Sequence, residues 1–136
     1  MTAERPDNPE RPVRVFLSAD IYRDGRGAAF AWVNETTGKR RSEDVPSVTK
    51  IEVEYHGLLS ALKGLPEGAQ AQIISDSPLL CGQFYEVSPV PSRVLALSVR
   101  TLWVIRRRRL DVTVLCVPRA DNPAWKRLRK GRWQRG

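Results

Sequence analysis

Apolar residues along this chain occur in two patterns, short continuous runs and longer stretches with helical spacing. Short runs rich in Val, Ile, Phe and Ala have the composition of β-strands, and clusters of Gly, Asn, Asp and Thr separate them. The predicted strands cover residues 13–20, 28–33, 40–45, 71–75 and 111–117. The first three follow one another through short turns, which predicts a β-meander.

A long helical pattern comes after the meander. Apolar residues recur at helical spacing from Ile51 to Leu62, and Gly64 ends the pattern. Ser47 or Thr49 is the expected N-cap, because a side-chain oxygen there can accept from the first free backbone N–H groups.

Three further helices complete the predicted order of elements. They cover residues 78–85, 94–105 and 123–130, with Asn122 as the N-cap of the last helix and Gly131 as its stop. The order is β-β-β-α-β-α-α-β-α. A meander followed by αβ units predicts an α/β fold in which helices flank a five-stranded mixed sheet.

Length and composition indicate one globular domain. The chain has 136 residues, of which 41% are hydrophobic and 28% charged, enough for one core and too few for two. We expect a flexible arm at 1–11, the domain at 12–130 and a basic tail at 131–136. No apolar run is long enough to span a membrane, and the N-terminus lacks the hydrophobic stretch of a signal peptide. We therefore expect a cytoplasmic protein, and we expect it to be a monomer.

The cysteines and the histidine give little sign of chemistry. Cys81 and Cys116 lie in apolar stretches without the second pair that a zinc site or a disulfide framework needs. We expect two buried, reduced thiols. The only histidine, His56, lies inside the long predicted helix, where we expect a structural or surface role.

Positive charge is concentrated in the last third of the chain. Residues 1–90 carry 10 Lys and Arg against 13 Asp and Glu, whereas residues 91–136 carry 13 against 2, for a formal net charge of +8. Of the 23 basic residues, 18 are Arg, whose planar group can donate two hydrogen bonds to one phosphate. This distribution favours a polyanionic partner, with nucleic acid as the leading candidate.

Three carboxylates occupy positions where they can meet. Asp20 ends the first predicted strand, Asp76 ends the fourth, and Glu54 lies in the first turns of the long helix. Ligands in α/β sheets bind at the carboxyl ends of neighbouring parallel strands, so these side chains converge if the two strands pair. A cluster of like charges is tolerable when divalent cations neutralise it, and oxygen ligands favour Mg²⁺ or Mn²⁺. Each acid alone also suits a turn or a helix start, so the hypothesis depends on all three.

These residues give the chain a resemblance to the ribonuclease H family over roughly residues 13–130. The segment TKIEVEYHGLLSAL at 49–62 is similar to the family's threonine…alanine-glutamate-tyrosine…alanine-leucine helix. IISDS at 73–77 is similar to its serine-aspartate-serine strand end. VPRADNPAWK at 117–126 resembles a valine-proline-arginine segment that leads through an asparagine to an alanine-aspartate pair. The resemblance implies an RNase H-like fold.

The resemblance also implies a reaction, the hydrolysis of the RNA strand of an RNA/DNA hybrid by two metal ions. Asp20 is implied to bridge two Mg²⁺ or Mn²⁺ ions, with Glu54 and Asp76 completing the ligands and Asp121 as a further candidate ligand. Such enzymes recognise the hybrid by its shape and its 2′-hydroxyl groups, so no base-specific contacts are expected.

Cations near the C-terminus are the expected contacts to nucleic-acid phosphates. They are Arg119, Lys126, Arg129, Lys130 and Arg132. Helical spacing puts Lys126, Arg129 and Lys130 on one face of the last helix, with Trp125 and Leu128 on the side that can dock on the sheet.

Two positions depart from the family pattern. Asp20 is followed by Ile21 and Tyr22, where the family has glycine and a small residue. Lys126 stands where the family has its fourth acid, and a cation there cannot bind a metal. Three functions therefore stay open. They are a hybrid-specific endonuclease, a nuclease or strand-transfer relative of the same fold acting on another nucleic acid, and a non-catalytic nucleic-acid-binding module.

Overall fold

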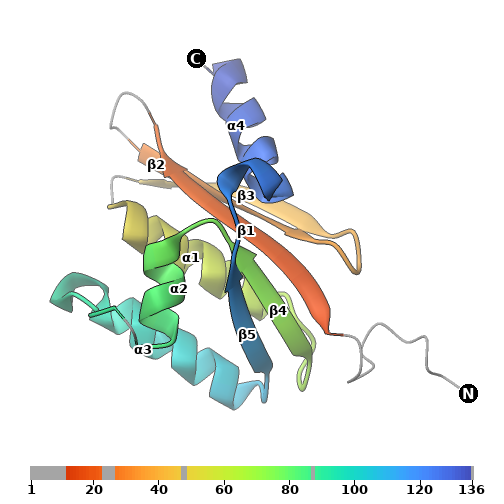
Figure 1. Ribbon diagram of the computed structural model, residues 1–136, viewed down its shortest axis with the longest axis vertical. Helices are drawn as coiled ribbons and strands as arrows, with labels where there is room; N and C mark the ends of the chain where they lie inside the picture. Colours follow the sequence, from red (N-terminus) through yellow and green to blue (C-terminus); the bar gives the residue numbers. More distant parts are fainter. Residues whose placement is uncertain (1–11, 23–26, 47–48, 87, 136) are drawn as a thin grey trace, which may run out of the picture.

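A single mixed sheet organises the molecule. The computed structural model describes residues 12–22, 27–46, 49–86 and 88–135, with the backbone alone from residue 130 onward. The strands are β1 (Val13–Ile21), β2 (Gly27–Asn34), β3 (Arg40–Pro46), β4 (Gln70–Ser75) and β5 (Asp111–Cys116) (Figure 1). Their order is β3-β2-β1-β4-β5, antiparallel within the meander and parallel for β1–β4 and β4–β5. The predicted five-stranded mixed sheet is confirmed.

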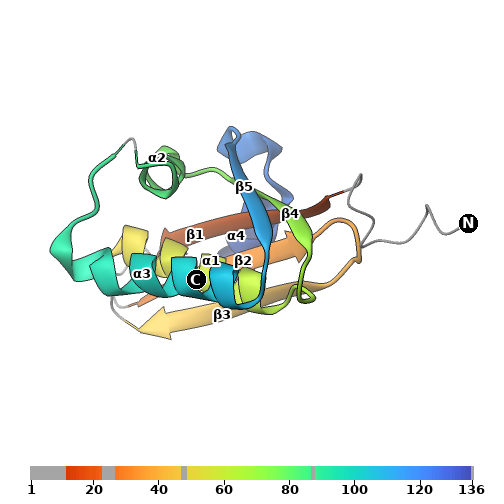
Figure 2. The same cartoon turned by 90° about the horizontal axis from the view of Figure 1, so that it is seen from below.

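Helices cover both faces of this sheet. They are α1 (Lys50–Lys63), α2 (Pro78–Phe84), α3 (Ser92–Arg107), the short 3₁₀ helix η1 (Arg119–Asp121) and α4 (Pro123–Arg135). α1 packs on β1 and β2 from one side, and α4 packs on the same two strands from the other. α3 packs mainly against α1, which places it at the outside of the first layer (Figure 2).

The two faces of the sheet carry two hydrophobic cores of unequal size. Successive residues of β1 point to opposite faces, so Leu17 joins the large core under α1 with Leu58 and Ile73. Phe16 instead joins a small core under α4 with Leu128. β1 is therefore buried on both faces, as expected of a central strand.

Gly57 sets the distance between α1 and the sheet. A Cβ atom at this position would lie 2.7 Å from Leu17 Cδ1 and 3.0 Å from Phe30 Cβ. Only a residue without a side chain lets the helix backbone approach these strands so closely. The N-terminus of α1 is fixed by Glu52, whose Oε1 accepts hydrogen bonds from Thr49 N at 3.2 Å and Thr49 Oγ1 at 2.7 Å.

Two sequence expectations are wrong in detail. α4 continues to Arg135 instead of ending at Gly131, because an interior glycine costs a helix only about 1 kcal/mol and does not by itself end it. Cys116 is exposed, because it lies at the end of the edge strand β5, while Cys81 is half-buried. Burial raises the pKa of the Cys81 thiol to about 12.

Other expectations fall on parts of the chain that carry no description. These are the arm at 1–11, the alternative N-cap Ser47, and the side chains of Lys130 and Arg132. Within the described ranges, no helix combines the length and the apolar character needed to cross a bilayer.

Candidate active site at the ends of β1 and β4

The carboxyl ends of β1 and β4 bring two of the predicted acids to one edge. The strands run parallel in a register that places Leu17 beside Ser75, so the residues that follow each of them are neighbours. Ser18 Oγ donates a hydrogen bond to Asp76 Oδ2 at 2.8 Å. Asp20 lies two residues further along β1, on the same face as Ser18, because strand side chains alternate.

Arg119 lies against both aspartates. Its Nη1 is 3.9 Å from Asp20 Oδ2, and its Nε is 3.9 Å from Asp76 Oδ2. The Asp20 side chain is 23% exposed and that of Asp76 only 2%, so the two carboxylates face one cation from different depths. The sequence predicts that divalent cations neutralise these acids and that Arg119 contacts phosphate. In the structure Arg119 itself provides a counter-charge to Asp20 and Asp76.

Asn122 holds the edge of the site together, a role that the sequence reasoning limited to capping. Its side chain is fully buried, and Nδ2 donates to Leu17 O at 2.9 Å and to Asp76 Oδ2 at 3.2 Å. Its Oδ1 accepts from Ala124 N at 2.9 Å, which confirms the predicted N-cap. One amide thus joins the start of α4 to β1 and to Asp76. The clue in the sequence was an amide after a proline-arginine segment, but nothing local indicated its partners.

Glu54 approaches the same edge from α1. It is 5% exposed, and this burial raises the pKa of its carboxyl above the usual value. A hydrogen bond with the Ser77 side chain works in the opposite direction, while the charge of Asp76 raises the pKa further. Ser77 also caps α2, since its Oγ accepts from Leu80 N at 3.1 Å. Glu54 is therefore a buried carboxyl that holds its proton more tightly than a free glutamate.

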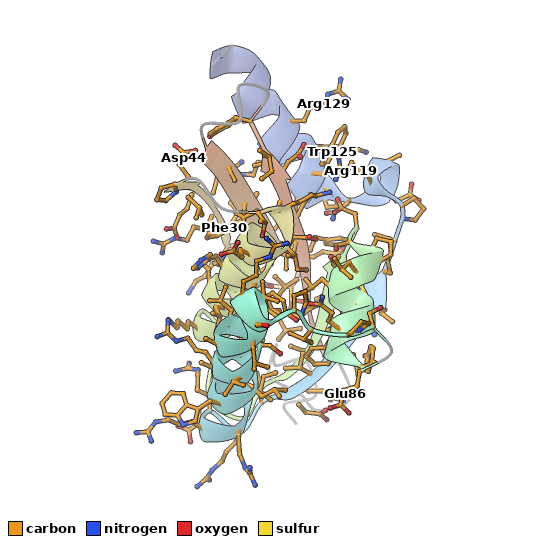
Figure 3. The ribbon with its side chains drawn as sticks, turned by 90° about the vertical axis from the view of Figure 1, so that its left-hand side faces the viewer. Phe30, Asp44, Glu86, Arg119, Trp125 and Arg129 are labelled. Carbon is orange, nitrogen blue, oxygen red and sulfur yellow. The ribbon has the colours of Figure 1, made fainter. Side chains whose placement is uncertain are left out.

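The remaining predicted residues lie around η1 and α4. Asp121 is exposed on η1, and Lys126 is exposed on α4. Trp125 carries two guanidinium groups near its ring, Arg119 at 5.5 Å and Arg129 at 5.3 Å from the centroid (Figure 3). This stack links the carboxylate edge to the cationic surface of α4, and sequence reasoning had expected Trp125 only to dock on the sheet.

His56 lies apart from this edge. It is half-buried on α1 and lines a shallow pocket with Trp32 and Arg41 on the side of β2 and β3. This placement agrees with the structural or surface role expected for it.

Carboxylate oxygens at this edge are the kind of donor that a hard divalent cation takes. Asp20 and Asp76 already face a shared cation, Arg119, and one or two carboxylates completed by water commonly hold Mg²⁺. Among the described residues, no three or more His, Cys, Asp or Glu side chains are arranged to hold a metal ion. Glu54 shares a hydrogen bond with Ser77, and Lys126 replaces the fourth acid.

Known proteins support the fold without giving a closer relative. No family model matches the chain, and no curated protein matches it. Among solved structures, RNase H1 from the halophilic archaeon Halobacterium salinarum NRC-1 is similar with a TM-score of 0.74 and 18% identity, covering 92% of this chain and 99% of that one. LC11-RNase H1 in complex with an RNA/DNA hybrid gives 0.72 and 17%, covering 82% and 88%. The N-terminal RNase H domain of a Mycobacterium tuberculosis protein gives 0.68 and 22%, covering 90% and 98%.

These similarities define the class. The chain has an RNase H-like fold, which confirms the resemblance read from its motifs at the level of architecture. At 17–22% identity they establish the fold alone, and what the chain does depends on its own residues.

Proposed function

We propose that this protein hydrolyses the RNA strand of RNA/DNA hybrids at the edge formed by Asp20, Glu54 and Asp76. The observation that carries the proposal is the shared cation position. Two aspartates on neighbouring parallel strands face one positive group at 3.9 Å, with a buried third carboxyl at the same edge. Acids at one edge raise the cost of ionising one another unless cations balance them, and a divalent ion beside Arg119 would supply further balance.

A single divalent ion is the cofactor that this donor set supports, with Asp20 and Asp76 as its holders. When bound, Mg²⁺ or Mn²⁺ supplies Lewis-acid activation of water and of a phosphate oxygen. Arg119 would then be free to turn from the carboxylates to a backbone phosphate. The contact with the Trp125 ring would keep the Arg119 guanidinium near the edge. Glu54 becomes a ligand only in its ionised form, which its burial disfavours.

Hybrid is the proposed substrate for two reasons. LC11-RNase H1, which shares the fold, is in complex with an RNA/DNA hybrid. The exposed cations Lys126 and Arg129 on α4 continue from the carboxylate edge and suit contacts to phosphates along a duplex.

A substrate panel tests the proposal directly. Labelled hybrid, duplex DNA, duplex RNA and single strands are incubated with the full chain and Mg²⁺ or Mn²⁺. We expect cleavage of the RNA strand of the hybrid alone. Asp76→Asn and Asp20→Asn should each lower the rate about 100-fold or more, because each removes a carboxylate that would hold the divalent ion.

The matched control is Asp111→Asn, the same chemical change at an exposed acid where β5 begins, and it should keep the parent rate. Cleavage that survives in both site variants would show that these acids are not the active site. Cleavage of duplex DNA or RNA at a comparable rate would keep the site but replace the substrate with another nucleic acid.

A non-catalytic hybrid-binding module is the second candidate, and two observations favour it. Arg119 neutralises two of the acids without a metal, and Lys126 stands where the family has its fourth acid. This candidate predicts tight binding of hybrid without cleavage, and binding that is unchanged when divalent ions are removed by a chelator. The nuclease proposal predicts turnover that stops under the same conditions.

A further inference from the structure

The outer face of α3 carries an unusual amount of exposed apolar surface. Among the described residues, Leu95, Val99, Leu102 and Trp103 are each 51–57% exposed, although all four belong to one helix. Scattered exposed apolar residues are normal, but a contiguous group marks an interaction surface. This group lies outside the carboxylate edge and has no part in the proposed hydrolysis.

The spacing of these residues is that of a helix-pairing seam. Leu95, Val99 and Leu102 stand at i, i+4 and i+7, the positions that line one side of a helix facing another helix. The opposite side of α3 already has its partner, because Val94, Thr101 and Val104 are buried against the rest of the domain. α3 therefore has one seam that packs on α1 and a second seam that faces outward.

This second seam is an open surface of α3 alone. It includes Ser92, Leu95, Ala96, Val99, Arg100 and Trp103. An apolar strip along one side of a helix suits the ridge of side chains on another helix.

One border of the exposed seam is strongly basic. Arg93, Arg100 and Arg107 follow one another at seven-residue spacing and form a ridge on one flank of the seam. Arg107 lies over the Trp103 ring at 5.3 Å, which joins this ridge to the apolar surface. α3 contains no acidic residue.

We propose that the outer face of α3 is a docking site for an amphipathic helix of a partner protein, with acidic residues flanking its apolar side. Charge complementarity carries the choice of occupant. Acidic flanks meet the arginine ridge while leucine-like residues pack on the exposed apolar seam. A second copy of this chain would bring a helix with the same arginines and no acids, so the like charges would oppose pairing.

Two other occupants are outcomes of the experiment. A duplex offers phosphates to the arginines but leaves Leu95, Val99 and Leu102 without apolar partners. An anionic bilayer offers phosphates and an apolar phase, and vesicles test it separately from the peptides.

The probes are two synthetic helical peptides with identical leucines at i, i+4 and i+7, one flanked by Glu and the other by Lys. Each is labelled with a fluorophore and checked to be monomeric at the concentration used. Anisotropy titration with the full chain should show the Glu-flanked peptide binding at least tenfold more tightly than the Lys-flanked one. Added salt should weaken this binding, because part of it is ionic.

Paired variants locate the binding. Val99→Ser with Leu102→Ser should weaken the Glu-flanked peptide tenfold or more, and Arg100→Glu should remove the preference for Glu flanks. The matched control is Leu79→Ser with Leu115→Ser, two exposed leucines on α2 and β5. Because all four side chains are exposed, the substitutions should leave the melting temperature unchanged.

Several results overturn the proposal. One is equal affinity for the two peptides. Another is that the control variant Leu79→Ser with Leu115→Ser weakens peptide binding as much as Val99→Ser with Leu102→Ser does. A further one is self-association in sedimentation experiments that Val99→Ser with Leu102→Ser abolishes, which assigns the face to a second copy. The last is binding to phosphatidylglycerol-containing vesicles or to duplexes, but to neither peptide, lost in the same variant.

Discussion

The two faces of the sheet are built on different principles. Under α1 the packing is apolar and close, with Leu17, Leu58 and Ile73 fully buried and Gly57 admitting the helix backbone to van der Waals contact. Under α4 the apolar core is small, and hydrogen bonds of Asn122 to β1 and to Asp76 join the helix to the strands.

This difference separates stability from chemistry. The α1 side supplies most of the apolar burial that stabilises the domain. The α4 side places a carboxylate, an amide and a guanidinium at one edge, where each depends on the others for its hydrogen bonds and its charge balance. Variants can therefore be chosen that affect one side at a time, and they distinguish packing from electrostatics.

The largest effect is expected on the α4 side, for Asn122→Asp. The new carboxylate takes the place of a donor 3.2 Å from Asp76 Oδ2 and 2.9 Å from Leu17 O. A buried charge facing another carboxylate should lower the free energy of unfolding by about 3 kcal/mol or more. Urea denaturation measures the change. The reverse exchange at the exposed neighbour, Asp121→Asn, serves as control, and a similar loss there would show that burial of Asn122 is not the cause.

Gly57→Ala tests the α1 side. The added methyl group meets Leu17 and Phe30 at distances shorter than ordinary contact, so overpacking should cost about 1–3 kcal/mol. The higher helix propensity of alanine offsets about 1 kcal/mol of this loss. Gly64→Ala is the control, because a Cβ there makes only ordinary contacts and should change the free energy of unfolding by less than about 0.5 kcal/mol. A stabilised Gly57→Ala variant would contradict the close approach of α1.

Glu54→Gln tests how a buried carboxyl, which belongs to α1 but lies at the carboxylate edge, makes stability depend on pH. The raised pKa of Glu54 means that the folded state holds the proton more tightly than the unfolded chain, so parent stability falls as pH rises above about 4.5. The amide removes this penalty. Glu54→Gln should therefore be more stable than the parent near neutral pH and equal to it near pH 4.

Glu52→Gln is the control of opposite sign for this test. Hydrogen bonds from Thr49 lower the pKa of Glu52, so its contribution is present above about pH 4.5 and is lost as pH falls. Glu52→Gln should be less stable than the parent at neutral pH and equal to it in acid. If both variants change stability by the same amount at every pH, titration of these two groups is not the cause.

Lys126→Asp is expected to have the smallest effect and concerns the metal alone. Restoring an anion at this position should lower the Mg²⁺ concentration needed to raise the melting temperature, since ligand binding to the folded state stabilises it. Arg127→Asp makes the same change of charge one residue along α4, on another side of the helix. It should leave the required Mg²⁺ concentration as in the parent. An equal response in both variants would show that Lys126 points away from the site.

Much of the architecture was determined by the sequence itself. Strand composition between turn residues predicted every strand, and helical spacing together with capping residues predicted the four α-helices. These signals are local, so they do not depend on the partner that each element meets. Asp20, Asp76 and Glu54 could be selected for the same reason, since strand ends and helix starts are local features. The motif at 117–126 supported the fold and marked Lys126 as a departure.

Tertiary structure alone decided what surrounds these residues. Arg119 is 99 positions from Asp20 along the chain, and no local pattern predicts that its guanidinium lies between two aspartates. Leu95 and Leu102 belong to the helical pattern at 94–105, but α3 packs mainly against α1, and their side of the helix is an exposed seam. Periodicity records which residues are apolar, whereas the number of neighbours that a helix acquires depends on how the whole chain packs.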